Sequence, residues 1–489
     1  MPLTLNRSAL ARLPANVAIP SFDPARVSTG IVHLGIGNFF RAHLARYTHD
    51  LMALRDDALG WGITAVGLLP ADGAMVAVLG AQDGLYTLIE RDGVVERTTV
   101  VGSLVGAVLA DGDRAAVLAT IDRPTTRIVS LTVTEHGYCL NRATRRLDFD
   151  HPLIRRDLAD PANPASAIGV LVEGYRRRRA AGARAFSALS CDNVQANGHV
   201  LRRAVIDLAA AIDPGLADWI TANARFPSSM VDRITPVTRA EDIDEIAGRY
   251  GVADGRPVFC EPFRQWVIED DFAAGRPDWN LAGAQFVTDV SPYELMKLRL
   301  LNTSHLAICA PARLMGYTYV HEAIGDPLLR GYMQALMQRE TMPTLRPVPG
   351  VDLARYQATL LKRFANPAIG DTVERVNTDA PLNYLLDPLR DRLAQGADAD
   401  LLCFALAAWL RRARGTDEQG EPIDVRHPLA SLLRERAIKG GDDPGPMLAI
   451  RELFGDLGEN RMFVADVRRQ LSSLYRKGVV ATLMDVVPG

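Results

Sequence analysis

The feature that most constrains the fold is a change of pattern along the chain. Up to about residue 287, short runs rich in β-branched residues alternate with stretches of helical periodicity; beyond it the strand signals largely stop. Alternating strands and helices pack as a parallel sheet covered by helices on both faces. The sequence therefore predicts an α/β domain over residues 1–287 and a mostly α-helical domain over residues 288–489, and a length of 489 residues suits two cores better than one.

The expected elements are short runs with clear periodicity. The strands are expected at Ile31–Leu34, Gly62–Val66, Arg127–Val133 and Ala185–Leu189. The helices are expected at Arg41–Ala53, Ala165–Ala180, Tyr293–Leu306, Leu328–Met337, Leu353–Phe364, Leu401–Arg414 and Val464–Tyr475.

Charge and apolar patterning exclude several classes of protein. The 55 basic and 58 acidic residues nearly balance, so nothing points to nucleic acid or an anionic membrane as partner. The longest apolar run, Leu401–Leu410, is about half of what a bilayer requires and indicates a buried helix. Because the N-terminal residues contain no apolar core of a secretory signal, we expect a cytoplasmic protein.

Cysteine and histidine usage argues against disulfides and metal. The five cysteines are far apart, odd in number and without a CxxC pair, which speaks against both a disulfide framework and a zinc knuckle. The chain has no HExxH motif, and its nine histidines are scattered. We therefore expect no metal site.

A strand-to-helix turn with two close glycines, Gly35 and Gly37, follows the first strong strand. Such a turn lets the backbone approach a pyrophosphate. Phe40 occupies the place of the third glycine of the usual fingerprint, so the motif is incomplete, and a tight turn in any α/β domain is the alternative. Asp72, after the second strand, can accept hydrogen bonds from the adenosine ribose and would favour NAD over NADP, unless it is simply a turn residue before Gly73.

The segment from Ser291 to His305 is the strongest candidate for catalysis. Ser291 with Glu294 is a helix start with a capping box. At about 100° per residue, Glu294, Lys297, Asn302 and His305 then fall within one arc of about 140°. A lysine held against apolar groups loses solvation of its charged form, so its pKa falls toward the range of a general base. The alternative is an ordinary surface lysine on a partly exposed helix.

A second polar cluster, Ser190-Cys191-Asp192-Asn193, follows the strand expected at Ala185–Leu189. Ligands of open α/β sheets bind at the carboxyl ends of the strands. Asn193 can therefore donate to the alkoxide that forms during alcohol oxidation, and an Asx-turn is the alternative.

Together these segments resemble the long-chain mannitol dehydrogenase family over nearly the whole chain. The matching segments are the glycine turn with Phe39–His43, then Thr132–Tyr138, Ser190–Asn193, Phe226–Pro236 and Lys297–His305. The resemblance implies a Rossmann-type N-terminal domain followed by a mostly helical C-terminal domain. It also implies NAD-dependent oxidation of a polyol, mannitol to fructose first, with sorbitol or arabinitol as alternatives, by a monomeric enzyme.

The resemblance also implies a role for individual residues. The catalytic group would be Lys297 as a base that works without zinc, Asn193 and Asn302 as oxyanion donors, and His305 orienting the reacting hydroxyl. Glu135 and Glu294 would flank the proton path, and Asp232, Val231 and Arg375 would bind the polyol. The cofactor residues would be Gly35, Gly37, Phe39, Phe40, Arg41 and Asp72.

The chain departs from the family pattern after Arg375. Family members that act on mannitol often carry a lysine in a glycine/serine-rich loop there, whereas this chain reads Val376 to Tyr384 without one, and Asn383 is a candidate replacement. This puts mannitol itself in doubt. A hexuronate reductase such as fructuronate reductase is the alternative within the fold, although no extra cation for its carboxylate is evident; a non-catalytic, NAD-binding redox sensor is the alternative from another class.

Overall fold

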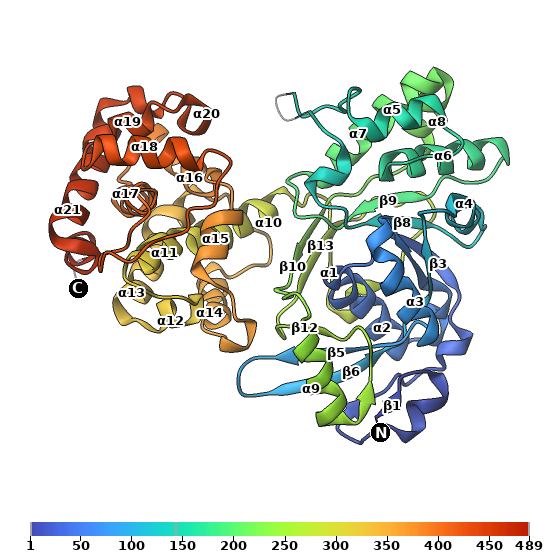
Figure 1. The fold of residues 1–489 in the computed structure, drawn as a ribbon. Helices are drawn as coiled ribbons and strands as arrows, with labels where there is room; N and C mark the ends of the chain where they lie inside the picture. The colour runs from blue at the N-terminus through green and yellow to red at the C-terminus, as the bar shows by residue number, and fades with distance from the viewer. Residues whose placement is uncertain (1, 142–143, 488–489) are drawn as a thin grey trace. The chain divides into compact units, whose positions relative to one another are not determined.

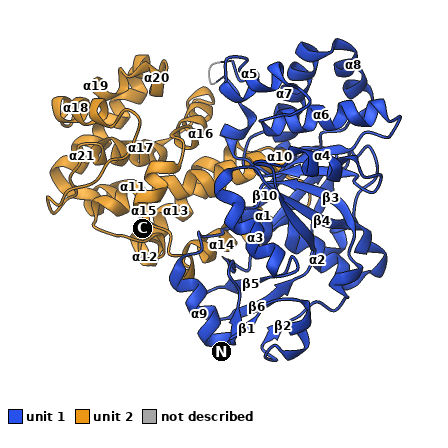
Figure 2. Ribbon diagram, turned by 45° about the vertical axis from the view of Figure 1, so that its right-hand side comes forward, with its two compact units in different colours: residues 1–291 blue, residues 292–489 orange. Residues whose placement is uncertain are grey.

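The computed structural model describes residues 2–141 and 144–487 and divides into two compact units, residues 1–291 and 292–489 (Figure 2). The first unit is built around a parallel sheet, and the second consists of helices (Figure 1). The fold class expected from the sequence, a Rossmann-type domain followed by a mostly helical one, is confirmed.

The main sheet of the first unit has five parallel strands. In spatial order they are β7 (Leu104–Leu109), β4 (Gly62–Gly67), β3 (Thr29–Leu34), β8 (Ile128–Leu131) and β9 (Ser187–Ser190). Counted from β3 as the first strand, this is the 3-2-1-4-5 order of dinucleotide-binding folds. The chain changes direction across the sheet between β3 and β8, so the loops after these two strands lie where such folds bind ligands.

Both faces of this sheet are buried, as the β-branched runs require. Along β3, Ile31 packs in the core on one face and Val32 in the core on the other. Helices α1 (Asn38–Ala42) and α2 (Leu44–Leu54), with α3 (Gly73–Ala81), contribute to the first core. The second core is closed by α4 (Arg114–Asp122), α5 (Pro152–Ala159), α6 (Ala167–Ala180), α7 (Asn197–Ile212) and α8 (Pro214–Asn223).

Smaller sheets complete the first unit. A mixed sheet joins β12 (Val258–Cys260), β5 (Tyr86–Arg91), β6 (Glu96–Val101) and β2 (Val17–Ala18), and a three-stranded sheet joins β10 (Ser229–Asp232), β13 (Gln265–Glu269) and β14 (Gln285–Val287). Strands β1 (Leu3–Thr4) and β11 (Val252–Ala253) form a parallel pair beside α9 (Ala240–Tyr250).

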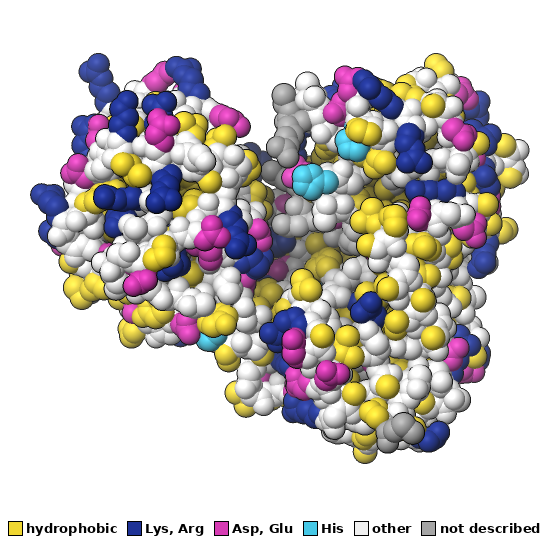
Figure 3. Space-filling view, viewed as in Figure 1, with side chains coloured by type: hydrophobic (Ala, Val, Ile, Leu, Met, Phe, Trp, Pro, Cys, Tyr) yellow, Lys and Arg dark blue, Asp and Glu magenta, His cyan; other side chains and the backbone are white. Residues whose placement is uncertain are grey.

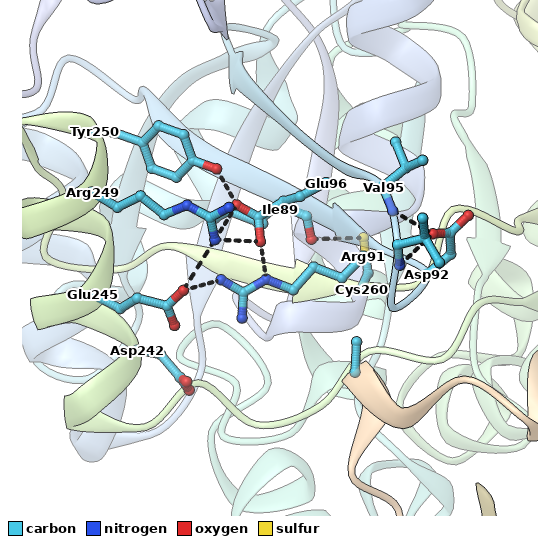
Figure 4. A network of polar contacts seen from close by, with 12 residues as sticks. Ile89, Arg91, Asp92, Val95, Glu96, Asp242, Glu245, Arg249, Tyr250 and Cys260 are labelled. Carbon is cyan, nitrogen blue, oxygen red and sulfur yellow. Dashed lines mark hydrogen bonds and ion pairs between the residues drawn. The ribbon is translucent and has the colours of Figure 1, made fainter.

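Ion pairs tie α9 to the β5–β6 hairpin (Figure 4). Arg91 Nη2 donates to Glu245 Oε1 at 2.6 Å, and Arg249 Nη1 donates to Glu96 Oε2 at 3.1 Å. Glu96 also contacts Arg91 and accepts from the hydroxyl of Tyr250. These contacts join segments about 150 positions apart, which periodicity along the chain cannot reveal.

The second unit contains one long composite helix and a set of further helices. The composite helix consists of α10 (Ser291–Met296), a π-helical segment (Lys297–Asn302) and α11 (Thr303–Leu314). The other helices are α12 (Val320–Gly325), α13 (Pro327–Ala335) with a π segment (Leu336–Thr341), α14 (Leu353–Phe364), α15 (Val373–Asp379), α16 (Asn383–Ala394), α17 (Asp400–Arg412), α18 (Ala430–Gly440), α19 (Gly445–Leu448), α20 (Arg451–Phe454) and α21 (Arg461–Val486).

Helix α17 forms the core of the second unit. All residues of the run Leu401–Leu410 are buried, as expected for a run too short to cross a membrane, and α17 packs against α11, α16 and α21. The backbone N–H groups of Leu401 and Leu402 donate to the Glu340 carboxylate, each at 2.8 Å, so this buried side chain caps the helix. In the described part of the chain, no helix is both long and apolar enough to span a bilayer.

Most expected elements are present, with two corrections. The helix expected at Arg41–Ala53 begins earlier, at Asn38, and is broken at His43, whose ring bonds to the Gln265 carbonyl oxygen at 3.0 Å. The second correction, the π segment at Lys297–Asn302, concerns the candidate catalytic residues and is described below. Helix α21 extends past the expected helix Val464–Tyr475 and is interrupted at Gly478, which has a φ of 80° and a ψ of 178°.

Candidate active site

The two glycines of the turn after β3 are needed for different physical reasons. Gly35 has a φ of +118°, and a Cβ there would lie 2.6 Å from the Thr132 carbonyl oxygen, so only glycine fits. Gly37 has an ordinary φ of −68°, is exposed, and has no atom within 4 Å of the position of a Cβ. Gly35 is therefore required by the fold itself, whereas Gly37 keeps open space beside the backbone, as a cofactor pyrophosphate needs.

The side chains that follow this turn serve the protein core. Phe40 is fully buried and stacks on His33, with ring centroids 3.8 Å apart. Arg41 is fully buried too, and its guanidinium donates to the Arg256 carbonyl oxygen at 2.5 Å and to Asn38 Oδ1 at 2.6 Å. Of the aromatic and basic residues expected to contact a cofactor, only Phe39 is partly exposed, so Phe40 and Arg41 support the turn from behind.

Asp72 lies at the carboxyl end of β4, next to the glycine turn in the sheet order. Its Oδ2 accepts from the Leu69 N–H at 2.9 Å, and its Cβ lies where a side chain on Gly67 would be. The local turn and a ribose contact are compatible, because one bonded carboxylate oxygen leaves acceptor capacity on the other.

The loops after β8 and β9 are held together by Asp192. This buried carboxylate accepts from the backbone N–H of Thr134 at 2.8 Å, from that of Val133 at 3.2 Å, and from the Tyr138 hydroxyl at 2.9 Å. Burial raises the pKa of Asp192, and these three bonds oppose that rise. Thr134 has a φ of 61°, so the network holds this backbone in a strained conformation.

Asn193 and Glu135 lie beside this anchored loop pair. Asn193 is exposed directly after Asp192, and Glu135 is exposed at the start of a 3-10 turn after Thr134. Asn197 is fully buried, donates to the carbonyl oxygens of Asp192 and Ser229, and accepts from Ser229 N–H at 2.9 Å. Asn193 is therefore presented by a rigid support, and the supporting residue Asn197 was not expected from the sequence.

Val231 and Asp232 end strand β10, where Asp232 pairs with Gln265 of β13. Both side chains are buried. The next residue, Arg233, has a fully buried side chain that donates to the Ala42 carbonyl oxygen at 2.5 Å and to the Glu261 carbonyl oxygen at 3.0 Å. This arginine fixes the end of β10 against the end of α1, so the position of Asp232 is set by the fold rather than by a loop.

Lys297 and Asn302 are the first and last residues of the π segment. The Thr303 N–H donates to the carbonyl oxygen of Leu298, five residues back, where an α-helix would use four. The α-helical spacing expected for residues 297–302 is therefore wrong. In an α-helix, residues five apart differ by about 140° in direction. Because a π turn holds one more residue than an α turn, it brings the side chains of Lys297 and Asn302 closer to the same side of the helix.

Both ends of this segment are shielded from water. Lys297 is 8% exposed and Asn302 is 8% exposed, and Glu294, on the preceding turn, is 9% exposed. The Asn302 Oδ1 atom has no hydrogen-bond partner among the described residues. A buried amide with spare capacity is costly in a purely structural role, and π segments are frequent at functional sites.

His305 lies one turn further along α11 and faces a charged pair. Its Nε2 is 3.6 Å from Asp371 Oδ2, and its ring packs against Phe364. Arg375 grips the same carboxylate through two bonds of 2.6 Å, from Nε to Oδ1 and from Nη2 to Oδ2. Burial lowers the pKa of His305 to about 4, so the imidazole is neutral near pH 7.

The placement of potential metal ligands and of charged side chains bears on the kind of chemistry this site supports. Among residues 2–141 and 144–487, no group of three or more His, Cys, Asp or Glu side chains is placed to hold a metal ion. The five cysteines are buried and unbridged. On the face drawn in Figure 3, basic and acidic side chains are interspersed over both units.

The two units match two parts of one protein family. Residues 29–281 match the family model of the mannitol dehydrogenase Rossmann domain, and residues 289–475 match that of the mannitol dehydrogenase C-terminal domain. The chain is 40% identical over 497 residues to a mannitol 2-dehydrogenase of Aspergillus fumigatus, covering 99% of each. It is 43% identical over 470 residues to the D-mannonate oxidoreductase of Escherichia coli, covering 94% of this chain and 96% of that protein.

Solved structures show the same similarity. The chain resembles Pseudomonas fluorescens mannitol 2-dehydrogenase, solved in a ternary complex with NAD and D-mannitol, with a TM-score of 0.87, 38% identity and 99% coverage of both chains. It also resembles a D-sorbitol dehydrogenase in substrate-free form, with a TM-score of 0.91, 35% identity, and coverage of 98% of this chain and 100% of that one.

Proposed function

Because the chain belongs to the mannitol dehydrogenase family, we propose that it oxidises D-mannitol to fructose with NAD, using Lys297 as the general base. The coarser activity, that of an NAD-dependent polyol oxidoreductase, follows from the relatives. The observation that carries the finer assignment is the π segment, which bears a buried lysine and a buried amide at its two ends.

The glycine turn fits NAD. The open space at Gly37 would receive the pyrophosphate, with Gly35 shaping the turn, Phe39 beside it and Asp72 toward the ribose. When bound, NAD accepts a hydride at nicotinamide C4. A ribose contact by Asp72 disfavours a 2′-phosphate by charge repulsion, so we propose NAD over NADP.

The protein supplies the proton transfer and the oxyanion contacts. Lys297, as the neutral amine, takes the hydroxyl proton while the carbinol C–H bond breaks and the C=O bond forms. The amide N–H groups of Asn302 and Asn193 hold the oxygen as it becomes negative. His305 is neutral and therefore orients the reacting hydroxyl by a hydrogen bond rather than by charge.

The remaining assignments concern the path of the proton to solvent and the other hydroxyls of the polyol. Glu294, buried one turn before Lys297, and Glu135, exposed after β8, would pass the proton from the lysine to solvent. Asp232, Val231 and Arg375 would contact the remaining hydroxyls of the polyol. Each of these assignments is tested by substitution, with substrate KM separating binding from proton transfer.

A second candidate is oxidation of D-mannonate, since the relative of that name is 43% identical to this chain. The deciding experiment compares kcat/KM for mannitol, sorbitol, arabinitol and D-mannonate with NAD and with NADP. We expect the highest value for mannitol with NAD. A preference for mannonate would replace the proposed substrate, and NAD binding without turnover of any substrate would favour a redox sensor instead.

A further inference from the structure

The carboxylate of Asp371 joins two residues assigned to the substrate. It lies 3.6 Å from the His305 ring nitrogen and accepts two hydrogen bonds from Arg375. Its side chain is 9% exposed, whereas that of Arg375 is 55% exposed. The accessible face of this cluster therefore presents an arginine that is already neutralised by a buried acid.

The backbone around Asp371 is fixed on both sides. Its carbonyl oxygen accepts from the Val320 N–H at 2.9 Å, and the Val373 N–H donates to the Thr318 carbonyl oxygen at 3.0 Å. Helix α15 then packs on α11 through the Asn377 amide, which donates to the Cys309 carbonyl oxygen at 3.0 Å. Because these bonds hold the backbone at Asp371 in position, a ligand that binds here must lie next to the negative charge of its carboxylate.

Among the described residues, the charged groups that pair with Arg375 are both acidic. Arg375 also contacts Asp379 at 3.4 Å, so two carboxylates face one guanidinium. Arg363 acts electrostatically on His305 as well, but its side chain is buried. A carboxylate placed here would compete with Asp371 for the fork of Arg375 and would meet a like charge.

A neutral hydroxyl meets no such penalty. Arg375 has five N–H donors, of which Asp371 takes two and Asp379 one, so a sugar oxygen can accept from one that remains. A hydroxyl can also donate to a remaining lone pair of Asp371. The cluster therefore favours an uncharged polyol over a sugar acid of the same length.

We propose that Asp371 is a specificity-determining residue that selects polyols against sugar carboxylates. The inference rests on the proposed function, because it takes the reacting substrate to lie beside His305 and Arg375. By facing His305 Nε2, the same carboxylate also favours the tautomer with its proton on that nitrogen, which makes Asp371 a positioning residue for His305.

The test is the substitution Asp371→Asn, with Asp379→Asn as the matched control. Asparagine keeps the size and an acceptor for Arg375 while removing the charge, and the control removes the other carboxylate that contacts the same arginine but does not face His305. The readout is the ratio of kcat/KM for D-mannitol to that for D-mannonate with saturating NAD. We expect Asp371→Asn to lower this ratio by about tenfold or more and Asp379→Asn to leave it within about threefold.

The outcomes separate this inference from the proposed function. A wild-type protein that fails to oxidise mannitol contradicts the proposed function, whatever the variants do. A wild type active on mannitol with an unchanged ratio in Asp371→Asn, or with the same shift in both variants, overturns the role of Asp371. Asp371→Ser is measured as a second variant, and circular dichroism shows which of the two Asp371 variants is folded. Each folded Asp371 variant must show the lowered ratio.

Discussion

Replacing Lys297 by methionine is the sharpest test of the catalytic assignment. Lys297 is only 8% exposed, so truncation to alanine removes three methylene groups from a buried stem, about 2.4 kcal/mol at about 0.8 kcal/mol each. Methionine keeps most of that stem and removes only the amine. Loss of a general base lowers the rate by about 10² to 10⁴, or about 2.7 to 5.4 kcal/mol of transition-state stabilisation.

The pH dependence gives an independent readout. Only the neutral amine accepts a proton, so wild-type mannitol oxidation should rise with pH through one ionisation, and Lys297→Met should lose that rise. His305 cannot replace this signature, because its pKa of about 4 leaves it neutral throughout the measured range. Steady-state kcat and kcat/KM across neutral and alkaline pH, with NAD affinity by fluorescence quenching, provide the assay. Near-normal turnover of Lys297→Met with an unchanged pH profile would refute Lys297 as the base.

Three further outcomes are expected. Asn302→Ala should lose about 2 to 4 kcal/mol of oxyanion stabilisation and leave the ionisation seen in the pH profile in place, since the amide carries no proton to titrate; a shifted ionisation in the kcat profile would contradict that role. Asp72→Ala should lower the ratio of kcat/KM for NAD to that for NADP, and an unchanged ratio means that this carboxylate only closes the turn at Leu69. Burial raises the pKa of Glu340 to about 7 from 4.5, so the folded protein binds a proton that the unfolded chain releases, and this stabilisation, full below about pH 4.5, is lost as pH rises through about 7. Between these limits the wild type should lose about 3 kcal/mol of unfolding free energy relative to Glu340→Gln in denaturant titrations; if the stabilities of the two proteins change in parallel with pH, this reasoning is wrong.

The sequence predicted elements best where one local signal dominates. The β-branched run at β3 and the apolar face of α14 gave bounds close to those observed, because burial on a sheet or helix face leaves its period in the chain. The break at His43 was missed because its cause is a bond to Gln265, over 200 residues away. Predicting the fold class required only the alternation of strand and helix signals along the chain.

Part of the candidate site could be grouped from the sequence, but the geometry of that part could not. Lys297, Asn302 and His305 stand in one short segment, so their grouping was visible, yet the π turn between them was not, since helical periodicity assumes a constant angle per residue. Asp371 was missed because, in the sequence around it, only Arg375, four residues later, points to a functional role. Its importance comes from α11, which lies more than 60 positions earlier.

The π segment has a consequence for how this helix tolerates changes in length. Removing one residue between Lys297 and Asn302 would let four-residue hydrogen bonding return, and because the wide turn already accommodates the extra residue, the side chains after it would keep about the same directions. Ser304 and His305, both in α11, would then stay in place. A single-residue deletion in this segment should therefore yield folded protein whose change is confined to the segment, whereas a deletion inside α11 would turn every later side chain of that helix by about 100°.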